Sequence, residues 1–158
     1  MARRRARELA FRTLFQSERG AAPLLEVWAS VRSEALGSQE GEPEDDVYGE
    51  RLDETALAFS EELLQSYGHN RTAVDAELVR RVEGWSFGQM SQTDLNVLRL
   101  AVTEMTYLSS PPEVVIEMAV RLAKKFGGDE SGRFVNGVLA KVMRALPVEA
   151  REAGVDAG

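Results

Sequence analysis

The sequence predicts an all-α fold, with about seven helices in two small helical bundles. Apolar residues recur at helical spacing along most of the chain, and no run alternates apolar and polar residues as a half-buried strand does. Turn-forming Pro, Gly and Asn stand between the periodic segments. With 158 residues the chain is most simply one domain with a sizeable core. We therefore expect one helical domain over residues 1–147 and a flexible tail over 148–158.

Three helices are expected in the N-terminal half. The first, at 3–18, has a core face made of Ala6, Leu9, Ala10, Thr13 and Leu14. The second, at 23–36, begins with a proline, which is favoured in the first turn. Residues 37–49 are acidic and rich in helix breakers, so we expect a loop insertion. The third helix, at 50–67, has a core face made of Leu52, Ala56, Phe59, Leu63 and Leu64.

Two more helices follow a turn expected at 68–70. The first covers about 72–83. The second covers 91–108, with Ser91 or Thr93 as its N-cap. Its apolar residues cover nearly the whole circumference, which is typical of a helix buried on all sides. We expect it to be the central helix of the fold.

The last two predicted helices are joined by a tight polar turn. The helix at 112–126 begins at a Pro-Pro pair, and its inward face is made of Val115, Ile116, Ala119, Leu122, Ala123 and Phe126. Gly127 is expected just past its end. The final helix, at 131–146, stops before Pro147.

Composition gives little support to an enzyme. The chain has no cysteine and one histidine, His69, in a predicted turn, so thiol chemistry and the common zinc sites are excluded. No nucleotide fingerprint and no nucleophile motif is present. We expect no catalysis, no metal and no cofactor. The basic start leads into an amphipathic pattern, and no apolar run could span a membrane, so we expect a cytoplasmic protein.

Charge is distributed unevenly, although the net charge is −7. Residues 3–12 hold five arginines against one glutamate, whereas residues 34–62 hold eleven acidic residues against one arginine. A confined basic patch on an acidic body fits phosphate binding. A solvated terminus is the competing interpretation of the arginines.

The final helix carries an aromatic ring among cations. Phe134 lies at the border of the apolar stripe, and Arg133 and Lys141 lie on the polar side. Gly137 costs about 1 kcal/mol in a helix interior relative to Ala. We therefore expect its backbone to be closely approached by another group. A ring flanked by cations can stack an unpaired base while the cations hold its phosphates. The pattern also fits a Phe134 that merely widens the core stripe.

Five segments of the chain together form a recognisable pattern. They are, in order, RRRARELA at 3–10, VLRLAVTEM at 97–105, PEVVI at 112–116, LAKKFG at 122–127 and RFVNGVL at 133–139. In these segments the sequence resembles the NusB family of bacterial transcription antitermination factors. They run from one end of the chain to the other, which makes the resemblance specific. It departs at Glu117-Met118 and at Thr103-Glu104-Met105, and the 37–49 loop looks longer than usual.

The resemblance implies two three-helix bundles with an extra helix. It also implies binding to boxA RNA of rRNA operon leaders, jointly with the ribosomal protein NusE, in a complex that keeps RNA polymerase processive. The RNA-contacting residues that it implies are Arg3, Arg4, Arg5, Arg7, Asp129, Glu130, Ser131, Arg133 and Phe134, to which we add Lys125 and Asn136. The partner-protein face that it implies contains Phe15, Asp94 and Arg99.

Two alternatives remain open. The chain could be an RNA-binding module like the N-terminal domain of rRNA methyltransferases, or a helical module that binds only protein. A homodimer that covers the basic arm, made of Arg3, Arg4, Arg5 and Arg7, is a separate hypothesis.

Overall fold

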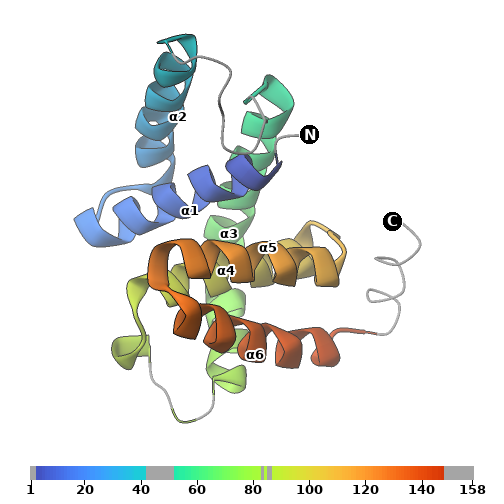
Figure 1. Cartoon of the computed structure of the whole chain (residues 1–158). Helices are drawn as coiled ribbons and strands as arrows, with labels where there is room; N and C mark the ends of the chain where they lie inside the picture. Colours follow the sequence, from blue (N-terminus) through green and yellow to red (C-terminus); the bar gives the residue numbers. More distant parts are fainter. Residues whose placement is uncertain (1–2, 42–51, 83, 85–86, 148–158) are drawn as a thin grey trace. The chain divides into compact units, whose positions relative to one another are not determined.

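The computed structural model describes residues 3–41, 52–82, 84 and 87–147. Within these ranges the chain forms α-helices and one short 3-10 helix and has no strand (Figure 1). The elements are α1 (Arg3–Gly20), α2 (Leu24–Gly41), α3 (Glu54–Arg81), η1 (Phe87–Gln89), α4 (Gln92–Tyr107), α5 (Pro112–Gly127) and α6 (Asp129–Ala145). The all-α class is confirmed. The described part has six α-helices rather than about seven, and none of them is long and apolar enough to cross a membrane.

The helix count differs because α3 continues through the predicted turn at 68–70. Only Asn70 leaves helical backbone angles there, with φ −112° and ψ 17°, so the turn is a kink within one helix. Val74 and Leu78 are buried beyond the kink, in the segment where a separate helix was predicted at 72–83. Burial on both sides of the kink outweighs the weak helix propensity of Gly68 and Asn70.

The chain divides into two compact units, of which the first contains residues 1–68. Within it α2 packs on α1, and the Ser60 hydroxyl of α3 donates a 2.7 Å hydrogen bond to the Ala6 carbonyl of α1. All the predicted core residues of α1 are buried, as are those of the third helix. α2 continues to Gly41, so the expected loop does not begin at residue 37; residues 42–49 lie outside the described ranges.

The second unit, residues 69–158, contains the C-terminal part of α3 with α4, α5 and α6. Every residue of α4 from Leu95 to Met105 is buried, which confirms a helix enclosed on all sides. Ser91 is its N-cap: the hydroxyl oxygen accepts a 3.0 Å hydrogen bond from the backbone N–H of Asp94. Both α5 and α6 pack against α4 and against each other.

A single residue, Gly128, separates α5 from α6, which run antiparallel (Figure 1). Gly128 has φ 90° and ψ −178°, a conformation that is essentially reserved for glycine. The polar turn expected between residues 126 and 131 is therefore shorter than predicted, because Asp129 and Glu130 already belong to the first turn of α6. Phe126 was also expected to face inward, but it is 40% exposed because α5 ends just beyond it.

Candidate nucleic-acid interface

The four arginines of the basic arm occupy the first turns of α1. All are half-buried, and the helix already begins at Arg3, so the arm is not a loose terminus. The guanidinium carbons of Arg3 and Arg7 lie 4.6 and 5.4 Å from the centre of the Phe59 ring. Cation–π attraction to this buried ring restrains both guanidinium groups at the start of α1.

The sign of the charge at the start of α1 is unusual for this chain. Each of the other described α-helices has an acidic residue in its first turn, whereas α1 has none. The N-terminus of a helix carries about half a positive charge, so cations there repel it. The arm and the helix end together create a strong positive potential, which suits an anionic partner.

The second predicted region lies at the connection between α5 and α6. Lys125 at the end of α5 is exposed, and its ammonium lies 5.5 Å from the ring of exposed Phe126. Asp129 and Glu130 are exposed in the first turn of α6. Ser131 is half-buried, and its hydroxyl donates a 3.2 Å hydrogen bond to the carbonyl of Gly127.

The predicted stacking ring keeps part of its surface exposed. Phe134 is half-buried, and Arg133 beside it is exposed. Asn136 does not share its side of the helix: residues two positions apart on a helix are about 160° apart. Asn136 instead lines a groove between α5 and α6. Phe134 and Asn136, both predicted RNA contacts, therefore lie on different sides of α6.

The predicted partner-binding residue of α1 is partly accessible. Phe15 is half-buried; its ring centre lies 6.0 Å from that of buried Phe11, and the Arg19 guanidinium lies 5.7 Å from the Phe15 ring. On α4, Asp94 is half-buried within the first turn. Its Oδ1 atom is buried and accepts no hydrogen bond from any described residue.

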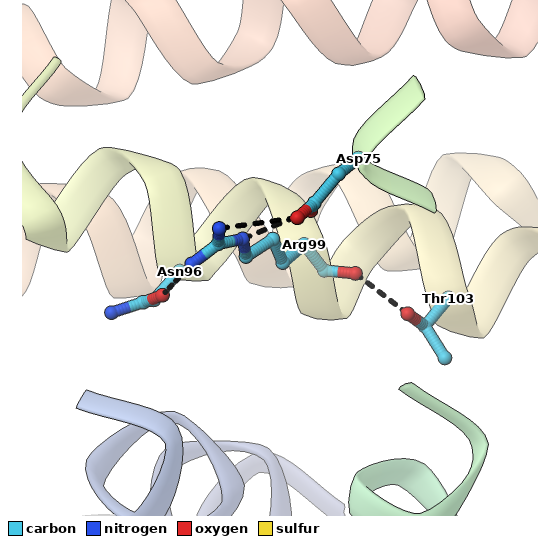
Figure 2. A network of polar contacts seen from close by, with 4 residues as sticks. All are labelled: Asp75, Asn96, Arg99 and Thr103. Atoms are coloured by element: carbon cyan, nitrogen blue, oxygen red, sulfur yellow. Dashed lines mark hydrogen bonds and ion pairs between the residues drawn. The ribbon is translucent and has the colours of Figure 1, made fainter. Parts of the chain in front are cut away.

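Arg99 does not lie on a surface, which corrects its predicted place in the partner face. It is 7% exposed, and its guanidinium pairs with the Asp75 carboxylate of α3 at 3.0 Å (Nε to Oδ1) and 3.2 Å (Nη2 to Oδ2). Nη1 also donates a 3.1 Å hydrogen bond to Oδ1 of Asn96 (Figure 2). Arg99 therefore ties α4 to α3 rather than meeting a partner directly.

The sequence analysis missed Asp75 and Asn96, which complete this polar network. The only indication of this network in the sequence is an arginine and an asparagine within the predicted helix at 91–108, which is otherwise apolar nearly all round. A buried arginine requires a carboxylate partner, but the sequence does not tell which one. Phe126 was missed as an exposed ring because it shares the period of the α5 core residues.

The all-α fold, the arginines in the first turns of α1 and the exposed Lys125 at the end of α5 define a class of small helical protein with local cationic surface that suits an anionic partner. The chain belongs to the NusB family, whose model matches residues 4–144. It is 51% identical over 144 residues to the transcription antitermination protein NusB of Deinococcus deserti, covering 91% of this chain and 82% of that protein. The NusB of Thermus thermophilus is 49% identical over 144 residues, covering 91% of each chain.

Solved structures give the same result. NusB of T. maritima superimposes with a TM-score of 0.78 at 30% identity, covering 96% of this chain and 98% of that one. A chain from a complex of antitermination factors NusB and NusE with double-stranded RNA gives 0.77 at 25% identity, covering 92% and 100%. The expected family is confirmed. Its members among the relatives are transcription antitermination proteins, which supports the prediction that the chain is not an enzyme.

Proposed function

We propose that this protein is a non-enzymatic antitermination factor. It binds single-stranded boxA RNA of rRNA operon leaders together with the ribosomal protein NusE, and the complex keeps RNA polymerase processive. The observation that carries the proposal is the reversed charge at the start of α1, where four arginines meet the positive helix end in a member of the NusB family. Such a protein acts in the cytoplasm, where bacterial RNA is made.

The arm supplies affinity rather than sequence choice. Arg3, Arg4, Arg5 and Arg7 neutralise phosphates, and phosphate contacts position the RNA without reading its bases. Two of the four are held on the Phe59 ring, which lowers the entropy lost when they grip phosphate.

The start of α6 supplies base recognition. Phe134 stacks one base, worth about 1–3 kcal/mol, while Arg133 and Lys125 hold neighbouring phosphates. The exposed carboxylates of Asp129 and Glu130 accept hydrogen bonds from base amino groups, and the Ser131 hydroxyl oxygen has a lone pair left for another. Because carboxylates also repel phosphate, Asp129 and Glu130 favour contact with the edge of an RNA base over contact with the RNA phosphate backbone.

The partner face is proposed on Phe15 and Asp94. The exposed part of the Phe15 ring gives apolar contact with NusE, and the Asp94 carboxylate gives electrostatic complementarity at the rim. Arg99 acts indirectly, because its bonds to Asp75 and Asn96 fix the first turns of α4, where Asp94 lies. A NusB–NusE complex with RNA is known for a structural neighbour.

An RNA titration tests the proposal. Fluorescence anisotropy of a labelled boxA RNA, with and without NusE, is measured over a range of salt concentrations. Four phosphate contacts predict that log K falls with log salt at a slope of about −3. A slope near zero removes the arm from the mechanism. Loss of NusE binding alone in Phe134→Ala, with RNA binding intact, would instead favour a protein-binding module.

A further inference from the structure

We propose that the groove between α5 and α6 binds one further nucleotide of the same RNA, on the side of α6 opposite Phe134. The inference rests on the proposed function, and it adds a second nucleotide site with its own residues. The groove has a volume of about 530 Å³ and is open to solvent. Its apolar floor is formed by Ile116, Val120, Ala140 and Met143, and its polar rim by Glu113, Glu117, Arg121, Lys124 and Asn136.

Charge varies along the groove. Because α5 and α6 run antiparallel from Gly128, the end near this connection carries Arg121, Lys124 and Asn136. Glu113 lies toward the far end. The cationic end favours a phosphate, whereas the acidic end repels one, so RNA enters near the connection and occupies only that part of the groove.

The cations at this end are placed for exchange with phosphate. Arg121 forms an ion pair with Glu117 at 2.8 Å, but both side chains are more than half exposed. Such a pair is worth at most about 1 kcal/mol, so a phosphate can displace the glutamate at little cost. The Lys124 side chain lies over Gly132, where an added Cβ would come within 2.6 Å of Lys124 Cγ. This packing holds the lysine beside the groove.

The floor and Asn136 suit a base. Val120 and Ala140 offer an apolar surface for a base face. The Asn136 amide can both donate and accept, as the Watson–Crick edge of an unpaired base requires. Its exposed side chain stands at the rim, where it reaches a base that lies on the floor.

A path joins the two nucleotide sites across the exposed face of α6. On the helical circumference, Gly137 and Arg133 lie between Phe134 and Asn136. A Cβ added at Gly137 would meet nothing within 4 Å, so the backbone is bare there and a strand can cross closely. Arg133 is exposed beside this crossing and can hold the phosphate of the crossing strand.

The test compares RNA binding by matched variants of the full chain. Ala140→Glu fills the groove and adds a negative charge, and Asn136→Ala removes the amide from an exposed position. Ala145→Glu is the control, because it makes the same chemical change on the same helix outside the groove. Anisotropy with boxA RNA, and with that RNA lengthened by uridines at either end, gives the affinities. Circular dichroism checks that each variant is folded.

We expect Ala140→Glu to weaken the binding of at least one of these RNAs by about 5- to 150-fold relative to Ala145→Glu, the range of one lost stacked base. Asn136→Ala should weaken the same RNA, and Arg121→Gln should make its salt slope shallower by about 0.7. If the unaltered protein binds no RNA, the proposed function itself fails. Suppose that Phe134→Ala weakens binding, but Ala140→Glu binds every RNA like Ala145→Glu and Asn136→Ala binds every RNA like the unaltered protein. Only the second site is then overturned. Loss of NusE binding with RNA binding unchanged in these variants overturns it as well.

Discussion

Replacing Gly137 by alanine should stabilise the protein. Gly137 lies in the middle of α6, is exposed, and has room for a Cβ, with no neighbouring atom within 4 Å. Alanine lowers the conformational entropy of the unfolded chain and favours the helix, together worth about 0.4–1 kcal/mol. For a chain of this size the melting temperature should rise by about 1–4 °C. Thermal unfolding followed by circular dichroism at 222 nm measures it.

The control for this prediction is Gly128→Ala. Gly128 also has nothing within 4 Å of an added Cβ, but its φ is 90°. The same substitution should therefore destabilise the protein by about 1–3 kcal/mol through backbone strain alone. Opposite signs at two equally roomy glycines would show that backbone angle, not space, decides the outcome. An unchanged or lower melting temperature for Gly137→Ala would refute the reasoning.

Three further predictions follow from single contacts. Ser91→Ala should lower the free energy of unfolding by about 1 kcal/mol in urea titrations, because α4 loses its N-cap, whereas Ser91→Asp should retain most of the stability. Asp75→Ala should cost about 3 kcal/mol because it removes the carboxylate that balances the charge of the buried Arg99 guanidinium. The double variant Asp75→Ala with Arg99→Met should be less destabilised than Asp75→Ala alone, and a more unstable double variant would contradict this. Phe59→Leu should weaken RNA binding up to about 10-fold in anisotropy without changing the salt slope, because every charge remains while two cation–π contacts are lost.

Sequence periodicity was enough to predict which side of most helices is buried. The predicted core residues of α1 and of α3 are buried, and α4 is buried on all sides as its pattern indicated. Burial of a helix face depends on local spacing, which the sequence displays directly. Phe126 is the exception, because a residue in the last turn keeps the core period after the neighbouring helix no longer covers it.

Breaks between helices were harder to predict. Gly and Asn at 68–70 and Gly, Gly and Asp at 127–129 have similar turn composition, yet the first is a kink within α3 and the second reverses the chain at one residue. Propensity shows where a helix can break, but packing on either side decides whether it does. The same limit applies to the Asp75–Arg99 pair, whose members are far apart in sequence.

The candidate site was predictable where it depends on composition and not where it depends on geometry. The arginines at 3–7 and the ring of Phe134 are visible as charge and pattern, and the structure leaves all of them partly exposed. The sequence predicts both Phe134 and Asn136 as RNA contacts on the last helix, and side chains two positions apart point to nearly opposite sides of a helix. Only the packing of α5 on α6 reveals that Asn136 belongs to a groove.

Two helices of this chain break the ordinary rules of helix stability, and both breaks coincide with proposed RNA contacts. α1 opens with arginines at its positive end, and α6 has a bare glycine at its centre. Each feature costs folding free energy, about 0.3–1 kcal/mol per misplaced charge and about 1 kcal/mol for the glycine. Local rules are expected to fail where function requires it. Arg4→Glu and Gly137→Ala should therefore each raise the free energy of unfolding and weaken RNA binding. If both variants were more stable and bound RNA as tightly as the unaltered protein, these two features would have an origin other than RNA binding.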